Sequence, residues 1–142
     1  MTHHATCRCG QLRAECTGEP VRVSVCHCLA CQRRTGSAFG VQARWPAALV
    51  RAMGEARTWT RVADSGRRVH YNFCPQCGST VTYTNENWPG LVAIPVGAFA
   101  DPTFSAPGFS VYEHRKHDWT TVLGEDVEHS STDSAARTAR SP

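Results

Sequence analysis

Residues 74–78 read C-P-Q-C-G, a pattern in which two thiolates flank a tight turn, as they do in a zinc knuckle. Pro75 fixes the first φ of that turn, and Gly78 permits a positive φ directly after the second cysteine. A second pair, in C-R-C-G at residues 7–10, also ends in glycine, and 64 residues separate the two pairs. Four thiolates are the usual ligand set of a structural zinc site, which here would join the start of the domain to a strand deep in its sequence. The predicted ligands are Cys7, Cys9, Cys74 and Cys77. The alternative is a set of inert buried thiols or an exposed redox C-x-x-C pair.

A second cluster, C-H-C-L-A-C at residues 26–31, places three cysteines within six residues. Three thiolates can converge on one ion and leave its fourth coordination position open, which is typical of catalytic rather than structural zinc. The expected ligands are Cys26, Cys28 and Cys31. The alternative is a site that a fourth protein ligand closes, and the residues that could do so are His27, Cys16, His70, His114 and His117.

Three thiolates also restrict the chemistry of the ion that they hold. They donate so much electron density that capture of a soft ligand, such as an incoming thiolate, is favoured over deep acidification of a bound water. A thiol coordinated to zinc loses its proton at neutral pH and is held for attack on an electrophile. The second cluster therefore predicts a zinc-dependent enzyme that acts on a thiol.

Composition excludes several other classes of protein. The chain has 142 residues, enough for one sizeable core, and 41% hydrophobic with 19% charged residues excludes a highly charged, disordered chain. The longest apolar stretch, residues 90–100, is too short to span a bilayer, and residues 1–10 show no secretory signal. We therefore expect a cytoplasmic, reducing location and no membrane partner. The formal charge of +3 falls to zero once seven thiolates hold two zinc ions, and Lys116 is the only lysine, so no nucleic-acid partner is expected.

The rest of the sequence is a pattern of strands and turns. Alternating apolar residues, bounded by turn residues, predict strands over 12–16, 21–26, 39–45, 58–63, 67–73, 80–84, 91–97 and 109–119. Helical periodicity is limited to a turn near 46–51. The end of the chain lacks large apolar residues after Val127 and is rich in Ser, Thr and Ala. We expect an all-β domain over residues 1–124 and a disordered tail over 125–142.

The order of these motifs resembles that of a known family. C-R-C-G, then C-H-C-L-A-C-Q-R-R-T-G-S-A-F, then F-C-P-Q-C-G is similar to the glutathione-dependent formaldehyde-activating enzymes, which are related to centromere protein V. The segment P-V-G-A-F-A-D-P, followed by His114 and by D-W at 118–119, resembles the C-terminal half of that family. The resemblance implies a β-tent fold of two stacked antiparallel sheets, a structural zinc on the first cluster and a catalytic zinc on the second. It also implies a carbon–sulfur lyase, similar to S-(hydroxymethyl)glutathione synthase, that joins glutathione or a similar thiol to formaldehyde or a small aldehyde, or releases it.

Residues near the second cluster are candidates for binding the substrate, and they are Gln32, Arg33, Arg34 and Ser37. The arginines could pair with the carboxylates of glutathione, or they could offset the charge of the thiolates. His114 and Trp119, in the matching segment, are expected at the border of the pocket. The alternative function is a non-catalytic, zinc-stabilised β-tent binding module, which a fourth protein ligand at the second cluster would favour. A homodimer is compatible with either function.

Overall fold

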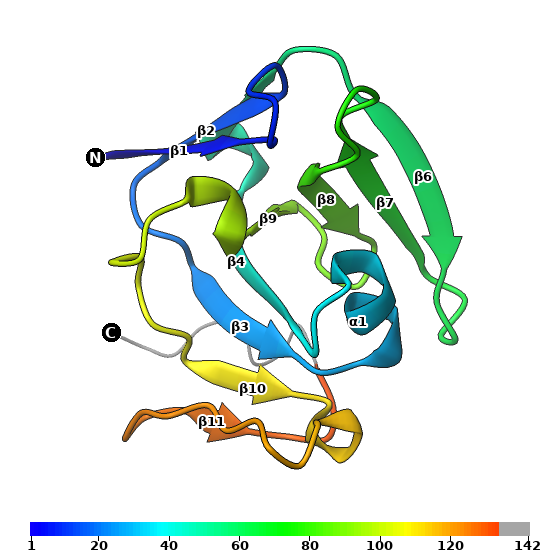
Figure 1. Cartoon of the computed structure of the whole chain (residues 1–142), viewed down its shortest axis with the longest axis vertical. Helices are drawn as coiled ribbons and strands as arrows, with labels where there is room; N and C mark the ends of the chain where they lie inside the picture. Colours follow the sequence, from blue (N-terminus) through cyan, green and yellow to red (C-terminus); the bar gives the residue numbers. More distant parts are fainter. Residues whose placement is uncertain (134–142) are drawn as a thin grey trace.

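Two β-sheets of unequal size make up the fold, as the computed structural model shows for residues 1–133, the part of the chain that it describes (Figure 1). The smaller sheet is antiparallel and contains, in order, β1 (Thr2–Thr6), β2 (Arg13–Thr17) and β5 (Val50–Met53). The larger sheet has the strand order β11-β10-β3-β4-β9-β8-β7-β6. Its strands are β3 (Arg22–Cys26), β4 (Gly40–Pro46), β6 (Arg57–Val62), β7 (Arg68–Phe73), β8 (Thr80–Asn85), β9 (Leu91–Pro95), β10 (Phe109–Val111) and β11 (Glu128–His129). The prediction of a mainly β fold with little helix is confirmed.

One face of the large sheet packs against the small sheet. Successive residues of a strand point to opposite faces, so Ala43 and Trp45 of β4 share a side. They form a core with Ala5 and Ala14 of the small sheet, and all four side chains are buried. Trp45 also donates a hydrogen bond from Nε1 to the carbonyl oxygen of Gly18 at 2.9 Å, just after β2. Apolar burial and this bond hold the two sheets together.

The opposite face of the large sheet carries polar side chains. Strand β3 is buried along its whole length, although its sequence, R-V-S-V-C, alternates polar and apolar residues. Arg22 lies opposite Arg44 of β4, and Ser24 lies opposite Gln42. Because these residues are buried yet point away from the core, the second face must border another enclosed space.

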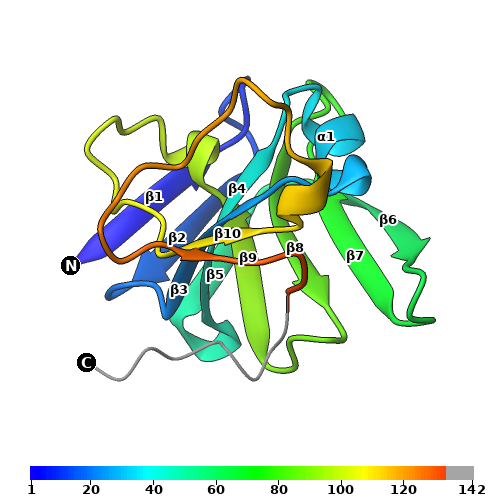
Figure 2. The same ribbon diagram turned by 90° about the horizontal axis from the view of Figure 1, so that it is seen from below.

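The large sheet is mixed, which differs from the two antiparallel sheets that were expected. Strand β10 runs parallel to β3, with Phe109 beside Ser24, and β11 runs parallel to β10. Parallel neighbours need a crossover connection of a dozen or more residues, and residues 112–127 supply one between β10 and β11. These two strands form one edge of the sheet, and the hairpin of β6 and β7 forms the other (Figures 1 and 2).

Strand β11 lies beyond residue 124, where the sequence analysis ended the domain. Backbone N–H groups of Glu128 and Ser130 donate to the carbonyl oxygens of Gly108 and Ser110, each at 2.9 Å. These main-chain bonds need no apolar side chain, so composition gave no sign of them. The start of the expected tail is therefore paired with the sheet, and the remainder, 134–142, lies outside the described residues.

A short α-helix, α1 (Leu29–Thr35), follows β3. It ends at Gly36, which has a φ of 69° and donates its backbone N–H to the carbonyl oxygen of Gln32. Seven residues are too few for a recognisable helical period, so the sequence did not predict it. The 3₁₀ helices are η1 (Ala47–Leu49), at the turn expected near 46–51, η2 (Val96–Phe99) and η3 (Glu113–Arg115), which replaces the end of the strand expected over 109–119. No helix within residues 1–133 has the length and apolar character that crossing a membrane requires.

Candidate metal centres and the adjoining cavity

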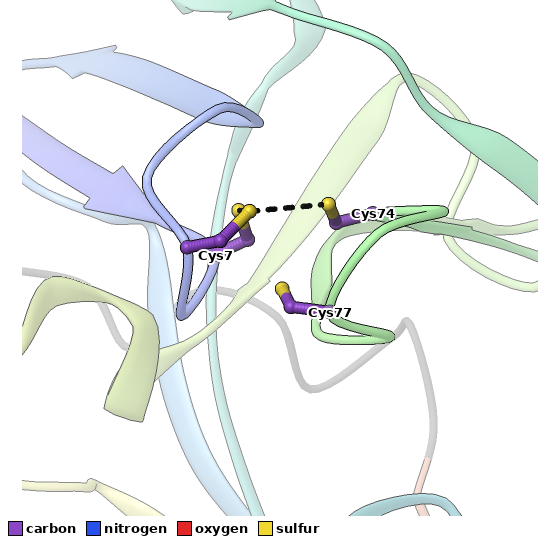
Figure 3. A group of neighbouring side chains, drawn as sticks. Cys7, Cys74 and Cys77 are labelled. Carbon is purple, nitrogen blue, oxygen red and sulfur yellow. Dashed lines mark hydrogen bonds between the residues drawn. The ribbon is translucent and has the colours of Figure 1, made fainter.

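Four cysteine sulfurs meet where the turn between β1 and β2 reaches the turn between β7 and β8 (Figure 3). The sulfurs of Cys7, Cys9, Cys74 and Cys77 all lie within 4.8 Å of one another. The Sγ–Sγ distance is 3.5 Å between Cys7 and Cys9, and 3.7 Å between Cys9 and Cys74. Zinc–sulfur bonds of about 2.3 Å in a tetrahedron place the sulfurs about 3.8 Å apart. The structure thus brings the four predicted ligands together, all as free cysteines, at the spacing that suits a tetrahedral metal ion.

Main-chain donors surround these sulfurs. The backbone N–H of Leu12 points to Cys7 Sγ at 3.3 Å, and that of Gln76 points to Cys74 Sγ at 3.4 Å. Hydrogen bonds with the side chain of Ser79 and, to a smaller extent, with its backbone N–H lower the pKa of Cys77 to about 5. Such donors stabilise negative charge on sulfur and fix the orientation of a metal ligand.

Gln11 adds a side-chain donor that sequence reasoning missed. Its Nε2 lies 3.0 Å from Cys74 Sγ and 2.7 Å from the carbonyl oxygen of Glu55, and its Oε1 accepts the backbone N–H of Glu55 at 2.9 Å. Gly54 has a φ of 100°, and a Cβ there would stand 2.1 Å from the carbonyl oxygen of Gln11. Only glycine therefore lets the end of β5 come close enough to hold the Gln11 amide.

The second group of sulfurs forms where β3 passes into α1. Cys26 ends the strand, Cys28 caps the helix and Cys31 lies in its first turn. The three Sγ atoms lie within 4.8 Å of one another, and the backbone N–H of Cys31 donates to Cys28 Sγ at 3.3 Å. The predicted trio is therefore brought together by one continuous segment.

No fourth Cys, His, Asp or Glu of residues 1–133 joins this trio. Residues 134–142 contain none of these residue types. His27, which lies between two of the cysteines in sequence, turns its Nε2 to Ser110 Oγ at 2.9 Å. The other alternative ligands lie elsewhere: Cys16 in the core between the sheets, His70 and His117 hydrogen-bonded to Thr60 and Gln32, and His114 on the wall of a cavity. The side-chain donor set is three sulfurs, which fits a metal ion with an open position.

Hydrogen bonding within the trio favours the thiolate form of one sulfur. Hydrogen bonds from Cys26 and then Cys31 lower the pKa of Cys28 to about 2. Hydrogen bonding to Cys28 and Cys31, together with burial, raises the pKa of Cys26. Arg34 lies close by. A Cβ added to Gly40 would stand 3.1 Å from the Nη2 of Arg34 and 3.7 Å from the Sγ of Cys31. The buried Nε and Nη2 atoms of Arg34 have no hydrogen-bond partner among residues 1–133. These two unpaired nitrogens suit a neighbouring centre of three thiolates and one divalent ion, whose net charge is negative.

The three cysteines line a cavity of about 700 Å³ next to the polar face of the large sheet. This volume lies within the usual range of small-molecule sites. Aromatic rings and polar side chains share its wall; among them are Tyr71, Tyr83, Trp88, Tyr112, Gln42, Arg44 and Arg61. The trio is therefore a potential metal centre that faces a space of substrate size.

The comparisons with known proteins agree with these observations. A family model described as glutathione-dependent formaldehyde-activating enzyme matches residues 2–115. The chain belongs to that family. This confirms the resemblance that the cysteine motifs indicated. Among solved structures, the chain is similar to a crystal structure of a Rhodobacter sphaeroides protein, with a TM-score of 0.53 and 18% identity over 67% of this chain and 85% of that chain, a likeness in fold alone. No curated protein matches the chain.

Within this member of the formaldehyde-activating family, none of the four substrate candidates lines the cavity. Arg33 and Ser37 are exposed, and Arg34 lies against Tyr83, with its Cζ 5.2 Å from the ring centroid. Gln32 Nε2 donates to the carbonyl oxygen of His27 at 2.9 Å and so ties α1 to the end of β3. Their part in binding substrate stays a prediction. Of the two residues expected at the border, His114 lines the cavity, and Trp119 is exposed beside a shallower hollow.

Sequence reasoning missed the polar residues of the wall, Gln42 and Arg44 above all. The available signal was the alternation of polar and apolar residues along β3 and β4, two strands whose apolar residues were assigned to the core. When both neighbours of a strand are buried, its polar positions must face either water or an internal cavity. Residues 21–26 and 39–45 could each be given a polar face in this way, but only the pairing of β3 with β4 shows that the two faces adjoin and line a cavity.

Proposed function

We propose that this protein is a zinc-dependent carbon–sulfur lyase that binds glutathione or a similar thiol and adds it to formaldehyde or a small aldehyde, or releases it from the adduct. The family match supports this class of reaction. The observation that carries the proposal is that Cys26, Cys28 and Cys31 converge without a fourth side-chain ligand from residues 1–133 and line a 700 Å³ cavity. A closed site would instead favour the non-catalytic binding module.

Two zinc ions per chain fit the two groups of cysteines. Cys7, Cys9, Cys74 and Cys77 would hold a structural ion, and the trio would hold a catalytic one. At the trio, zinc would supply the acidity that keeps an incoming thiol as thiolate at neutral pH. The substrate sulfur then forms a bond to the carbonyl carbon, the C=O π pair moves to oxygen, and this oxygen takes up the proton that the thiol has lost.

Tyr112 would help this oxygen. Its ring packs against the buried cluster that contains Cys26, and it lines the cavity. Burial raises the pKa of Tyr112, so its hydroxyl stays protonated and can donate a hydrogen bond to an oxygen that gains charge. Tyr112 also has a φ of 55°, a left-handed conformation that costs energy in a residue with a side chain and that is concentrated at functional sites.

Zinc-edge X-ray absorption during titration with glutathione tests the proposal. In protein that holds two zinc ions per chain, one sulfur ligand should be added at the trio. When formaldehyde is supplied with glutathione, the protein should also speed the loss of formaldehyde. S-methylglutathione, which has no free thiol, is the matched control and should leave the spectrum unchanged. An unchanged spectrum with glutathione and no faster loss of formaldehyde would contradict the proposed function.

A further inference from the structure

Arg44 is a buried cation that lines the cavity. Only 4% of its surface is exposed. Its guanidinium carbon lies 4.3 Å from the ring centroid of Trp88, and its Nη1 donates to Ser24 Oγ at 3.4 Å. Stacking on the indole fixes the plane of the guanidinium but does not neutralise its charge.

The neighbouring arginine, Arg22, has a carboxylate partner, which Arg44 lacks among the described residues. Arg22 lies opposite Arg44 on β3, is equally buried, and pairs through Nη2 with Asp133 Oδ1 at 2.8 Å. No carboxylate of residues 1–133 forms an ion pair with Arg44. Residues 134–142 contain neither aspartate nor glutamate. Because a buried guanidinium without an anion is costly, the cavity side of Arg44 is suited to an anionic group of a ligand.

Gln42 adds a second recognition group beside it. Gln42 is 2% exposed and lines the cavity, and its Nε2 donates to Ser24 Oγ at 2.9 Å. Its Oε1 is buried and has no hydrogen-bond partner in the described part of the chain. An unpaired acceptor next to a cation that has no carboxylate partner among the described residues matches the N–H and carboxylate groups of a peptide.

The register of the sheet places Arg44 near the three cysteines. Cys26 is two residues along β3 from Ser24, the residue that the Arg44 guanidinium contacts. Two residues of a strand correspond to about 7 Å. A thiol whose sulfur lies at the three cysteines can therefore also reach Arg44 with a carboxylate.

We propose that Arg44 is a specificity-determining residue that binds a carboxylate of a peptide thiol whose sulfur is held at the three cysteines, with Gln42 accepting an N–H of the same ligand. This inference rests on the proposed function, which it deepens by naming the residues that select the substrate. It places substrate recognition on β3 and β4 rather than on the arginines that follow Cys31.

Calorimetric titration of the zinc-loaded protein with glutathione and with its diethyl ester tests the inference, because the ester blocks both carboxylates. The wild type should bind glutathione about tenfold or more tightly than the ester, the range expected for hydrogen bonds to a charged group. Arg44→Met should remove most of this preference by weakening glutathione and leaving the ester within about twofold. Arg57→Met, which removes an exposed arginine outside the cavity, is the matched control and should keep the preference.

Several outcomes would overturn the inference: no measurable binding of glutathione, equal binding of the two ligands by the wild type, or an unchanged preference in Arg44→Met. Loss of the preference in Arg61→Met but not in Arg44→Met would also overturn it, because Arg61 lies on another strand of the wall. Should Arg44→Met fail to fold, Arg44→Lys keeps the charge without the planar fork and should retain only part of the preference. Titration with S-methylglutathione separates the two proposals. If no thiol reaches the metal, the proposed function fails. Weaker binding of S-methylglutathione to Arg44→Met than to the wild type would still support the role of Arg44. Equal binding of S-methylglutathione to the two proteins would overturn that role.

Discussion

Individual side chains differ in what they contribute to the two groups of cysteines. Gln11 contributes a neutral hydrogen bond to Cys74, and its amide is fixed by the backbone of Glu55. Arg34 contributes a positive charge near Cys31, and its buried Nε and Nη2 have no hydrogen-bond partner among the residues that the structure describes. The first kind of contact orients a ligand, and the second offsets the charge of a centre. Substitution of each should therefore change different properties.

Replacing Gln11 by leucine should weaken metal binding at the four-cysteine site. The change removes the only side-chain N–H donor to Cys74 within residues 1–133, and loss of such a contact typically lowers metal affinity by about 10- to 100-fold. Competition with a chromophoric chelator measures the effect. Gln76→Leu is the control, because its Oε1, an acceptor, lies 4.0 Å from Cys9 Sγ and gives a thiolate no stabilisation. Equal chelator sensitivity of the two variants would show that Gln11 does not support the site.

Tyr112→Phe should slow adduct formation without weakening the binding of the thiol. The phenol hydroxyl is lost but the packing against Cys26 remains, and loss of one hydrogen-bond donor to an oxygen that gains charge typically costs about 100-fold or more in rate. The rate of formaldehyde consumption, followed by NMR, and the dissociation constant of glutathione separate the two effects. Tyr71→Phe, on β7, is the control on the other wall of the cavity. A rate unchanged in Tyr112→Phe would remove this residue from the reaction.

At the scale of elements, helix α1 depends on its surroundings. It has seven residues, none of them buried, and a helix this short is unstable in isolation. Its position is fixed at the start by the Cys28 cap and on one side by Gln32, whose Nε2 also donates to the carbonyl oxygen of Arg115 at 3.1 Å. Because α1 carries Cys31, these contacts determine where the third sulfur of the trio lies.

Gln32→Ala should therefore loosen α1. Losing the hydrogen bonds of the amide to His27 and Arg115 should lower the free energy of unfolding by about 1–3 kcal/mol. It should also lower metal affinity at the three-cysteine trio, since Cys31 is no longer held in place. Urea unfolding and chelator competition measure these two effects, and Arg33→Ala, in the next and exposed position, is the control. If both variants behave like the wild type, Gln32 does not position the helix.

The elements also show what could be predicted from the sequence. Hairpin β6–β7 was predicted nearly to the residue because alternation and a D-S-G turn are local signals. Strand β11 and the parallel pairing of β10 were missed because they depend on main-chain bonds between distant segments. Among side chains, the cysteines could be grouped from their spacing. Arg44 could not be assigned, because its role depends on which strand lies beside β4 and on which face is enclosed.

At the scale of the whole molecule, the two groups of cysteines differ in the parts of the fold that they connect. Cys7 and Cys9 follow β1, whereas Cys74 and Cys77 lie between β7 and β8, so an ion bound there joins the two sheets. The trio belongs to one short segment and faces the cavity. Loss of metal should therefore affect the fold at the first group and the function at the second.

Paired substitutions separate these roles. Cys28→Ser should lower the zinc content from two per chain to about one, as measured by plasma mass spectrometry, and should leave the melting temperature nearly unchanged because no contact between the sheets depends on it. Cys74→Ser should also lose an ion but should destabilise the whole fold by several kcal/mol, since the binding energy of a structural zinc is folding energy. In the wild type, a chelator should remove the ion of the trio first, because its open position admits an added ligand. Similar melting temperatures for the two variants, or earlier loss of the four-cysteine ion, would show that the sheets are held together by their apolar core alone.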